Sequence, residues 1–135
     1  MNFDDAWEMI SEAARKTRSD YHLTLGELWD LLEDVPDDYT IPVDGCHSYR
    51  GYYEDLALSV NQEQKWTVAA VRMVLGCALN GEVFTGYKGG EYVMDQNTPL
   101  WLAEWGKDGR AILDLEIDHD EKTVGLVVMD IREVF

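Results

Sequence analysis

The fold is decided by residues 67–79, TVAAVRMVLGCAL, the most apolar stretch of the chain. Drawn as a helix, this segment has apolar side chains around most of its circumference and a single charge, Arg72. A helix with so little polar surface must be covered by other elements, so we expect it at the centre of the fold. Asn80 and Gly81, which follow it directly, are typical of a helix end.

Two amphipathic helices are expected before this one. Residues 3–18 repeat apolar side chains at helical spacing, with acids at the start and bases at the end, which predicts a helix that ends before Asp20. The next helix begins at Thr24, whose hydroxyl can accept from the Glu27 amide while the Glu27 carboxylate accepts from the Thr24 amide. It ends before Pro36, because proline disfavours a helical conformation in the preceding residue.

Short segments with β-branched and alternating apolar residues predict strands. After Pro99 the strands follow one another through short turns at residues 106–109 and 119–122, an order typical of an antiparallel meander. We therefore predict an α+β fold in a single domain, residues 1–135, whose antiparallel sheet with a C-terminal meander packs against about three helices. The expected strands are residues 40–43, 54–60, 83–84, 100–105, 111–117 and 123–131.

The composition is that of one ordinary globular domain. Apolar residues make up 46% of the 135 residues, yet no uninterrupted apolar run reaches the roughly 18 residues of a membrane span. The N-terminus opens with acids instead of the basic and apolar regions of an export signal. Cys46 and Cys77 have neither metal nor disulfide spacing, which fits a reducing compartment. We expect a cytoplasmic protein that does not bind membranes.

The chain is strongly acidic, with 27 acids against 11 bases and a formal net charge of −16. Such a surface repels phosphate backbones, so direct binding to nucleic acid is not expected. Two interpretations of the charge stay open. The excess of acid can serve solubility alone, or it can imitate nucleic acid towards a basic protein.

Acidic residues alternate along one predicted strand and its turn. Because successive side chains of a strand point to opposite faces, these carboxylates share one face at a spacing of about 7 Å, close to that of phosphates along one nucleic-acid strand. A solvated sheet face produces the same pattern. The candidate partner-binding residues are Asp114, Glu116, Asp118 and Asp120.

Two stretches combine glycine, tyrosine and a cation: DGCHSYRGYY at residues 44–53 and FTGYKGGEY at residues 84–92. Arg50 can bind a phosphate with two parallel hydrogen bonds, Lys88 can add a point charge, and glycine amides can line the site while a tyrosine stacks on a base. The predicted ligand-binding residues are His47, Ser48, Tyr49, Arg50, Tyr52, Thr85, Tyr87, Lys88, Gly89, Gly90 and Glu91.

A purely structural interpretation of these residues stays open. Arg50 can pair with Glu54 or Asp55, Lys88 can pair with Glu91, and the glycines can serve only to turn the chain. The second stretch is not a P-loop, because it lacks the spacing and the following hydroxyl residue of that motif.

Metal and catalytic chemistry are not expected. Asp44, Cys46 and His47 are zinc-ligand types, but a closed zinc site needs four protein ligands and no others accompany them. Cys46 and His47 are adjacent in the chain, so in a strand their side chains point to opposite faces and do not share a proton. We expect a binding protein rather than an enzyme, with no metal and no cofactor.

The motifs DG (44–45), HSYRGYY (47–53), FTGYKGGE (84–91) and TPLW (98–101) give the chain a family resemblance. On these residues it resembles a group of small uncharacterised bacteriophage and prophage proteins, over residues 25–110 and not over the tail from Ala111. The resemblance implies a phage-type accessory protein in the host-cell cytoplasm, a class that often acts against host defence, and it carries over no catalytic residue.

Two functions follow as hypotheses. The first is a non-catalytic, anti-defence protein that binds and sequesters a small phosphate-bearing nucleotide through the two glycine- and tyrosine-rich stretches. The second is an acidic inhibitor that imitates nucleic acid and binds a basic host protein. A homo-oligomer is compatible with either hypothesis.

Overall fold

The computed structural model describes residue 18, residues 20–60 and residues 63–129. The helix predicted for residues 3–18 lies outside the described residues except for Arg18. Arg18, Asp20 and Tyr21 are helical, and the His22 amide donates to the Arg18 carbonyl oxygen at 2.9 Å. The prediction that this helix ends before Asp20 is therefore wrong.

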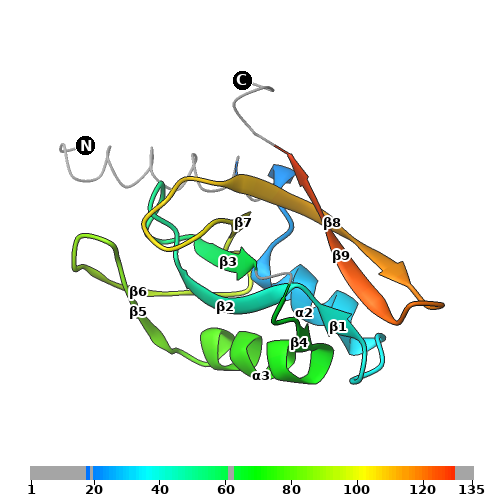
Figure 1. Ribbon diagram of the computed structural model, residues 1–135. Helices are drawn as coiled ribbons and strands as arrows, with labels where there is room; N and C mark the ends of the chain where they lie inside the picture. The colour runs from blue at the N-terminus through cyan, green and yellow to red at the C-terminus, as the bar shows by residue number, and fades with distance from the viewer. Residues whose placement is uncertain (1–17, 19, 61–62, 130–135) are drawn as a thin grey trace.

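The other elements of the described chain are two helices and nine strands (Figure 1). The helices are α2 (Leu25–Glu33) and α3 (Val68–Leu79). The strands are β1 (Thr40–Ile41), β2 (Val43–Ser48), β3 (Leu56–Val60), β4 (Trp66–Thr67), β5 (Val83–Thr85), β6 (Glu91–Val93), β7 (Leu100–Leu102), β8 (Arg110–Asp118) and β9 (Thr123–Met129).

Seven strands form one mixed sheet in the order β2-β3-β7-β8-β9-β1-β4, and β5 and β6 form a separate ribbon. β3 pairs with β7, and β1 pairs with β9, in parallel. The predicted fold, an antiparallel sheet packed against about three helices, is therefore wrong. The sequence interpretation placed successive strands side by side, whereas α3 and the β5–β6 ribbon form a long crossover between β3 and β7, and such a crossover allows parallel pairing.

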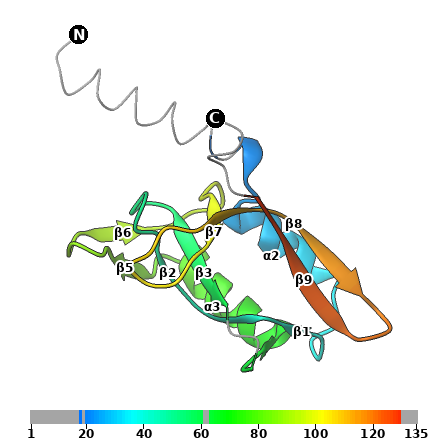
Figure 2. The same ribbon diagram turned by 45° about the horizontal axis from the view of Figure 1, so that its top comes forward.

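The sheet is strongly bent. β1 and β2 are separated only by Pro42, yet β1 lies beside β9 while β2 lies beside β3, at the other end of the strand order. Proline has no amide hydrogen to donate to a strand ladder, so Pro42 suits the point where the chain changes neighbours. Figures 1 and 2 show α2 and α3 on one side of the bent sheet, with the β5–β6 ribbon and the β8–β9 turn at opposite ends of the molecule.

The main core lies between the sheet and the two helices. Leu28 of α2, Leu75 of α3 and Ile112 of β8 are fully buried in it. The predicted helix at residues 67–79 therefore packs on the core with one face, but the expectation that other elements cover most of its circumference is wrong, because Met73 and Cys77 are exposed. The predicted capping box is also confirmed, because the Thr24 hydroxyl accepts from the Glu27 amide and the Glu27 carboxylate accepts from the Thr24 amide. Within the described chain, no helix has both the length and the apolar character needed to cross a bilayer.

A second, smaller cluster lies on the other face of the sheet. Ala57 of β3 and Trp101 of β7 are register partners, and the strand neighbours of Ala57 belong to the main core. Because side chains alternate along a strand, Ala57 and Trp101 point away from that core. Tyr49 and Ala103 complete the cluster. This face of the sheet carries the residues of the candidate site.

The strands predicted at residues 40–43 and 54–60 left the first glycine- and tyrosine-rich stretch, residues 44–53, as a connecting loop, and the first half of this stretch is instead a strand. β2 extends through Ser48 and pairs with β3, so the loop begins only at Tyr49. The second stretch forms the β5–β6 ribbon, with Thr85 opposite Glu91 and a turn at residues 86–90. The first stretch thus presents its side chains from a rigid strand and a short loop.

Replacing Leu75 with alanine should lower the free energy of unfolding by about 2–5 kcal/mol, because it leaves a cavity in the main core. Met73 on the same helix is 74% exposed, so Met73→Ala is the matched control and should change little. Chemical denaturation measures both. Equal midpoints for the wild type and Leu75→Ala would show that α3 is peripheral.

Candidate functional site

The two glycine- and tyrosine-rich stretches meet in space. The guanidinium carbon of Arg50 lies 5.2 Å from the centre of the Tyr87 ring, and the rings of Tyr53 and Tyr92 are 5.8 Å apart. The backbone of Gly86 lies against both of these rings, since a Cβ atom there would be 2.8 Å from Tyr92 and 3.4 Å from Tyr53. Segments that are 37 residues apart in the sequence therefore form one surface.

Tyr49 and Ser48 lie inside the fold. The Tyr49 ring is 4% exposed and stacks on Trp101 at 4.3 Å, and its hydroxyl accepts from the Gly109 amide at 3.0 Å. Ser48 is 1% exposed, and its hydroxyl donates to the Tyr53 carbonyl oxygen. Both side chains hold the loop in place, and neither is open to a ligand.

A buried ion pair between Arg18 and Asp55 holds the loop from Tyr49 to Asp55 in place. The sequence interpretation did not predict this pair. The Arg18 guanidinium donates to both carboxylate oxygens of Asp55, at 2.8 and 3.1 Å, and to Glu54 at 3.0 Å. The indole of Trp101 donates to the same Asp55 carboxylate at 2.9 Å. Asp55 is fully buried. Its burial raises the pKa of the carboxyl, and the hydrogen bonds from Arg18 and Trp101 oppose that shift.

This ion pair excludes the structural interpretation in which Arg50 pairs with Glu54 or Asp55. Arg18, not Arg50, pairs with Glu54 and Asp55. Among the described residues, Arg50 forms no ion pair, and Lys88 forms none with Glu91 or with any other acid. Both cations are exposed and remain available for a ligand.

A third segment, residues 104–107, joins the two stretches. The Trp105 ring packs edge-on against His47 at 5.4 Å and against Tyr87 at 6.1 Å. Gly106 has a φ of +75°, and a Cβ atom there would lie 2.9 Å from the Tyr87 ring, so only glycine fits this position without strain. Trp105 was not predicted as a site residue, because its role depends on where β7 and β8 bring the chain.

We name the exposed set Arg50, Tyr87, Lys88 and Trp105 the aromatic–cation surface. Tyr87 and Trp105 are 47% and 51% exposed, so each ring is held on one side and open on the other. His47 lies beneath Trp105, and its burial lowers the pKa of the imidazole, which is therefore neutral near pH 7. The neutral His47 ring supports Trp105, and Trp105 in turn supports Tyr87, so both exposed rings are held in place to stack on a ligand.

The remaining predicted residues lie around this surface. Tyr52 is 46% exposed, with the Arg18 guanidinium 3.9 Å from its ring centre. Thr85, Gly89, Gly90 and Glu91 are exposed in the β5–β6 ribbon. The amides of Gly86 and Gly89 donate to carbonyl oxygens within the turn, so they cannot line a phosphate site.

Cys46 is not available as a nucleophile at this surface. Cys46 packs on the main core and His47 lies against Trp105, consistent with the opposite orientation expected for neighbours in a strand. Burial raises the pKa of the Cys46 thiol to about 12, so the thiolate does not form near neutral pH. Within the described chain, no three His, Cys, Asp or Glu side chains are grouped so that they could hold a metal ion.

Comparisons of the chain with protein-family models, with curated proteins and with solved structures found no match. Two cavities, of about 360 and 640 Å³, lie at β9 and at the β8–β9 turn, and the described residues that line them include none of the aromatic–cation surface.

Asp55→Asn should lower the free energy of unfolding by about 3 kcal/mol, because it leaves the buried Arg18 guanidinium without its main counter-charge. This loss is at the lower end of the range for breaking a buried ion pair, because Glu54 still binds Arg18. Asp108→Asn, the same exchange at an exposed acid, is the control. Equal denaturation midpoints for the two variants would show that the pair is dispensable.

His22 makes stability depend on pH. It is 3% exposed, with its Nδ1 3.0 Å from the Leu100 carbonyl oxygen, and burial lowers the pKa of its imidazole. The unfolded chain therefore binds a proton before the folded protein does, and stability falls as the pH drops below the ordinary histidine value of 6.5.

We expect His22→Asn, which can keep the donor to Leu100, to lose less stability than the wild type between about pH 7.5 and about pH 5.5. Urea denaturation at both pH values gives the difference. The variant retains some dependence, because the pKa of His47 is lowered by burial as well. An identical loss in both proteins would exclude a neutral His22.

Proposed function

We propose that the protein binds a small phosphate-bearing nucleotide on the aromatic–cation surface. The contact between Arg50 and Tyr87 carries this proposal, because it puts a planar cation, an exposed ring and the neighbouring Lys88 in one place. A guanidinium matches the geometry of a phosphate, and an aromatic ring held on one side can stack on a base. A nucleotide supplies both groups at a short separation.

The charges around the surface support an anionic ligand. The chain carries 27 acids and 11 bases, yet Arg50 and Lys88 have no ion-pair partner among the described residues. A cation that is left unpaired in so acidic a protein can be neutralised by a ligand instead. Arg50 supplies two parallel hydrogen bonds and Lys88 a point charge.

The proposed activity is sequestration without turnover. The thiol of Cys46, next to His47, stays protonated and lies on the core side of β2, so it cannot act on the ligand. A role in a phage-type setting, where removing a nucleotide signal would act against host defence, is the part of the proposal that rests on the resemblance of residues 25–110 alone.

Calorimetry against a panel of linear and cyclic nucleotides tests the proposal. Arg50→Lys should weaken binding by about 1.5–3 kcal/mol, because it keeps the charge and removes the planar fork. The fold should survive, since Arg50 is exposed. The control is Arg72→Lys. Arg72 lies on α3, away from the two glycine- and tyrosine-rich stretches, and its guanidinium also packs over an aromatic ring, that of Trp29. No binding to the wild type, or equal binding by both variants, would remove the proposal.

A second candidate function is the acidic inhibitor of a basic protein. In the register of β8 with β9, Asp114 lies opposite Val127, Glu116 opposite Gly125 and Asp118 opposite Thr123, so the three acids share one face. All three are exposed. Asp120 follows in the turn, where its amide donates to the Asp118 carboxylate at 3.0 Å. The β8–β9 hairpin thus offers a partner a row of carboxylates.

If this hairpin binds a basic protein, the affinity should fall steeply with added salt, because exposed charges supply the attraction. Replacing Asp114, Glu116 and Asp118 together with lysine should abolish it. Pull-down from a host lysate at low and high salt, followed by titration of the captured protein, measures both effects. Binding that persists in high salt and survives the triple replacement would exclude the inhibitor.

A further inference from the structure

The bent sheet leaves a gap beside β9. β1 and β9 are neighbours through one register pair, Thr40 with Thr123, and beyond Pro42 the chain turns away to pair with β3. The edge of β9 that follows Thr123 therefore has no strand partner in the described part of the chain. The gap lies at a different place from the aromatic–cation surface, and its residues are not used by the proposed function.

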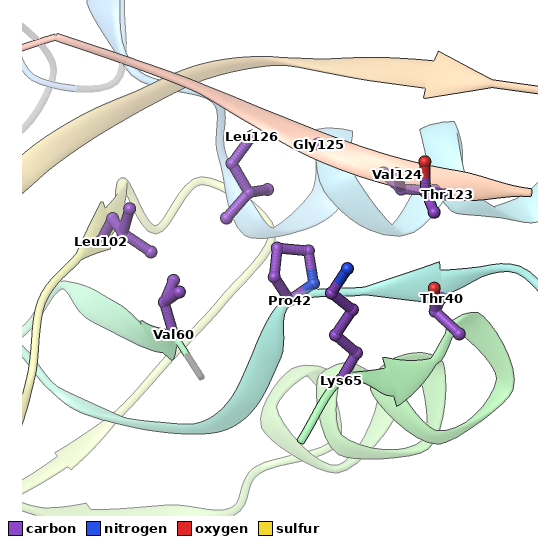
Figure 3. A pocket seen from close by; sticks show the side chains of 9 residues that line it. All are labelled: Thr40, Pro42, Val60, Lys65, Leu102, Thr123, Val124, Gly125 and Leu126. Atoms are coloured by element: carbon purple, nitrogen blue, oxygen red, sulfur yellow. The ribbon is translucent and has the colours of Figure 1, made fainter. Parts of the chain in front are cut away.

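A cavity of about 360 Å³ fills this gap. Its apolar wall consists of Pro42, Val60, Leu102 and Leu126, which come from four different segments (Figure 3). Figure 3 also shows the hydroxyl groups of Thr40 and Thr123 at one end, and the Lys65 side chain reaching up towards Pro42 with its nitrogen foremost. The volume is at the lower end of the range for small-molecule sites, which suits a ligand of about ten heavy atoms.

The charge of the cavity is opposite to that of the protein. Of the 135 residues 27 are acids, yet none of the nine described residues that line the cavity is acidic, and one is a lysine. Lys65 forms no ion pair with any described residue. The cavity therefore combines an apolar wall with a single available positive charge at its mouth.

The free edge of β9 adds a hydrogen-bond donor. The Thr40 amide donates to the Lys122 carbonyl oxygen at 3.1 Å, which shows that even-numbered residues of β9 turn their backbone groups towards β1. Backbone groups alternate along a strand, so the amide of Leu126 also points to this side, beyond the single pair that β1 provides. An anionic ligand held by Lys65 can accept a hydrogen bond from this edge.

We propose that this cavity binds a small aliphatic carboxylate, with its chain against Leu102 and Leu126 and its carboxylate at Lys65. No aromatic side chain is among the described residues that line the cavity, so these residues offer no stacking surface for a base and differ in chemistry from the aromatic–cation surface. The single cation matches one carboxylate, and the apolar wall matches an alkyl chain.

Nuclear magnetic resonance titration of the full-length protein with octanoate tests this assignment. Amide signals of Gly125, Leu126 and Val60 should shift, and affinity should rise by up to about fourfold for each added methylene along a series from butyrate to octanoate. Lys65→Met keeps the aliphatic stem and should weaken octanoate binding by up to about fivefold, the upper limit for an exposed charge pair. Lys107→Met removes another exposed lysine, one already paired with Glu104, and should leave octanoate binding unchanged.

Three results would overturn the assignment. Absence of localised shifts would show that the cavity does not bind the probe. Equal shifts from octylammonium, or unchanged octanoate affinity in Lys65→Met, would show that the alkyl chain alone is recognised. Concentration-dependent dimerisation, measured by sedimentation and accompanied by the same amide shifts without a ligand, would assign the gap to a second copy of the chain instead.

Discussion

The buried ion pair between Arg18 and Asp55 is the interaction on which the candidate site depends. Asp55 lies at the end of the loop that begins at Tyr49, and its carboxylate receives hydrogen bonds from Arg18 and from Trp101 of β7. One side chain thereby ties the loop, the segment that carries Arg18, and the β7 strand together. Buried pairs of this kind contribute little net stability but are costly to break, so they act mainly to fix one arrangement.

The aromatic side chains around this pair extend its effect to the surface. Trp101 stacks on Tyr49, while Tyr52 lies against the Arg18 guanidinium. Because Tyr49 and Tyr52 are held by these contacts, Arg50, which lies between them in the chain, is directed towards solvent. Arg50 therefore meets Tyr87 from a loop whose conformation is already determined, which lowers the entropy that a ligand would have to remove.

The distribution of charge explains how an anion can approach so acidic a protein. Lys88 lies in the turn of the β5–β6 ribbon, and Arg50 contacts Tyr87 of the same turn. The β8–β9 turn lies at the opposite end of the molecule from this ribbon (Figure 1). Surface charges are screened over about 8 Å at physiological salt, so the distant acids contribute little to the potential at Arg50. The same separation leaves the row of acids on β8 accessible to a different partner.

Local sequence signals predicted the parts of the fold that local forces determine. The Thr24 capping box and the apolar segment at residues 67–79 gave the right helices, because their signals lie within a few residues. The parallel pairs of β3 with β7 and of β1 with β9 were missed, since they depend on contacts across the whole chain and on the path taken after Pro42.

The candidate site was predicted in part for the same reason. The composition of the two stretches indicated Arg50 and Tyr87, and these residues do meet. Their pattern could not separate the exposed Arg50 from the buried Tyr49 beside it, because both lie in one short loop. Asp55 was considered only as a partner of Arg50, and only the fold brings it together with Arg18 and Trp101. An aspartate next to the tyrosine-rich loop was the one clue to a buried partner.

The contact between Arg50 and Tyr87 is the central claim, and its most direct test needs no ligand. A guanidinium above an aromatic ring experiences the ring current, so the side-chain protons of Arg50 should resonate upfield of their positions in an unstructured chain. The account predicts that this shift is present in the wild type and absent in Tyr87→Leu. Arg50 signals at unstructured positions in the wild type, unchanged by Tyr87→Leu, would show that the two loops do not form one surface.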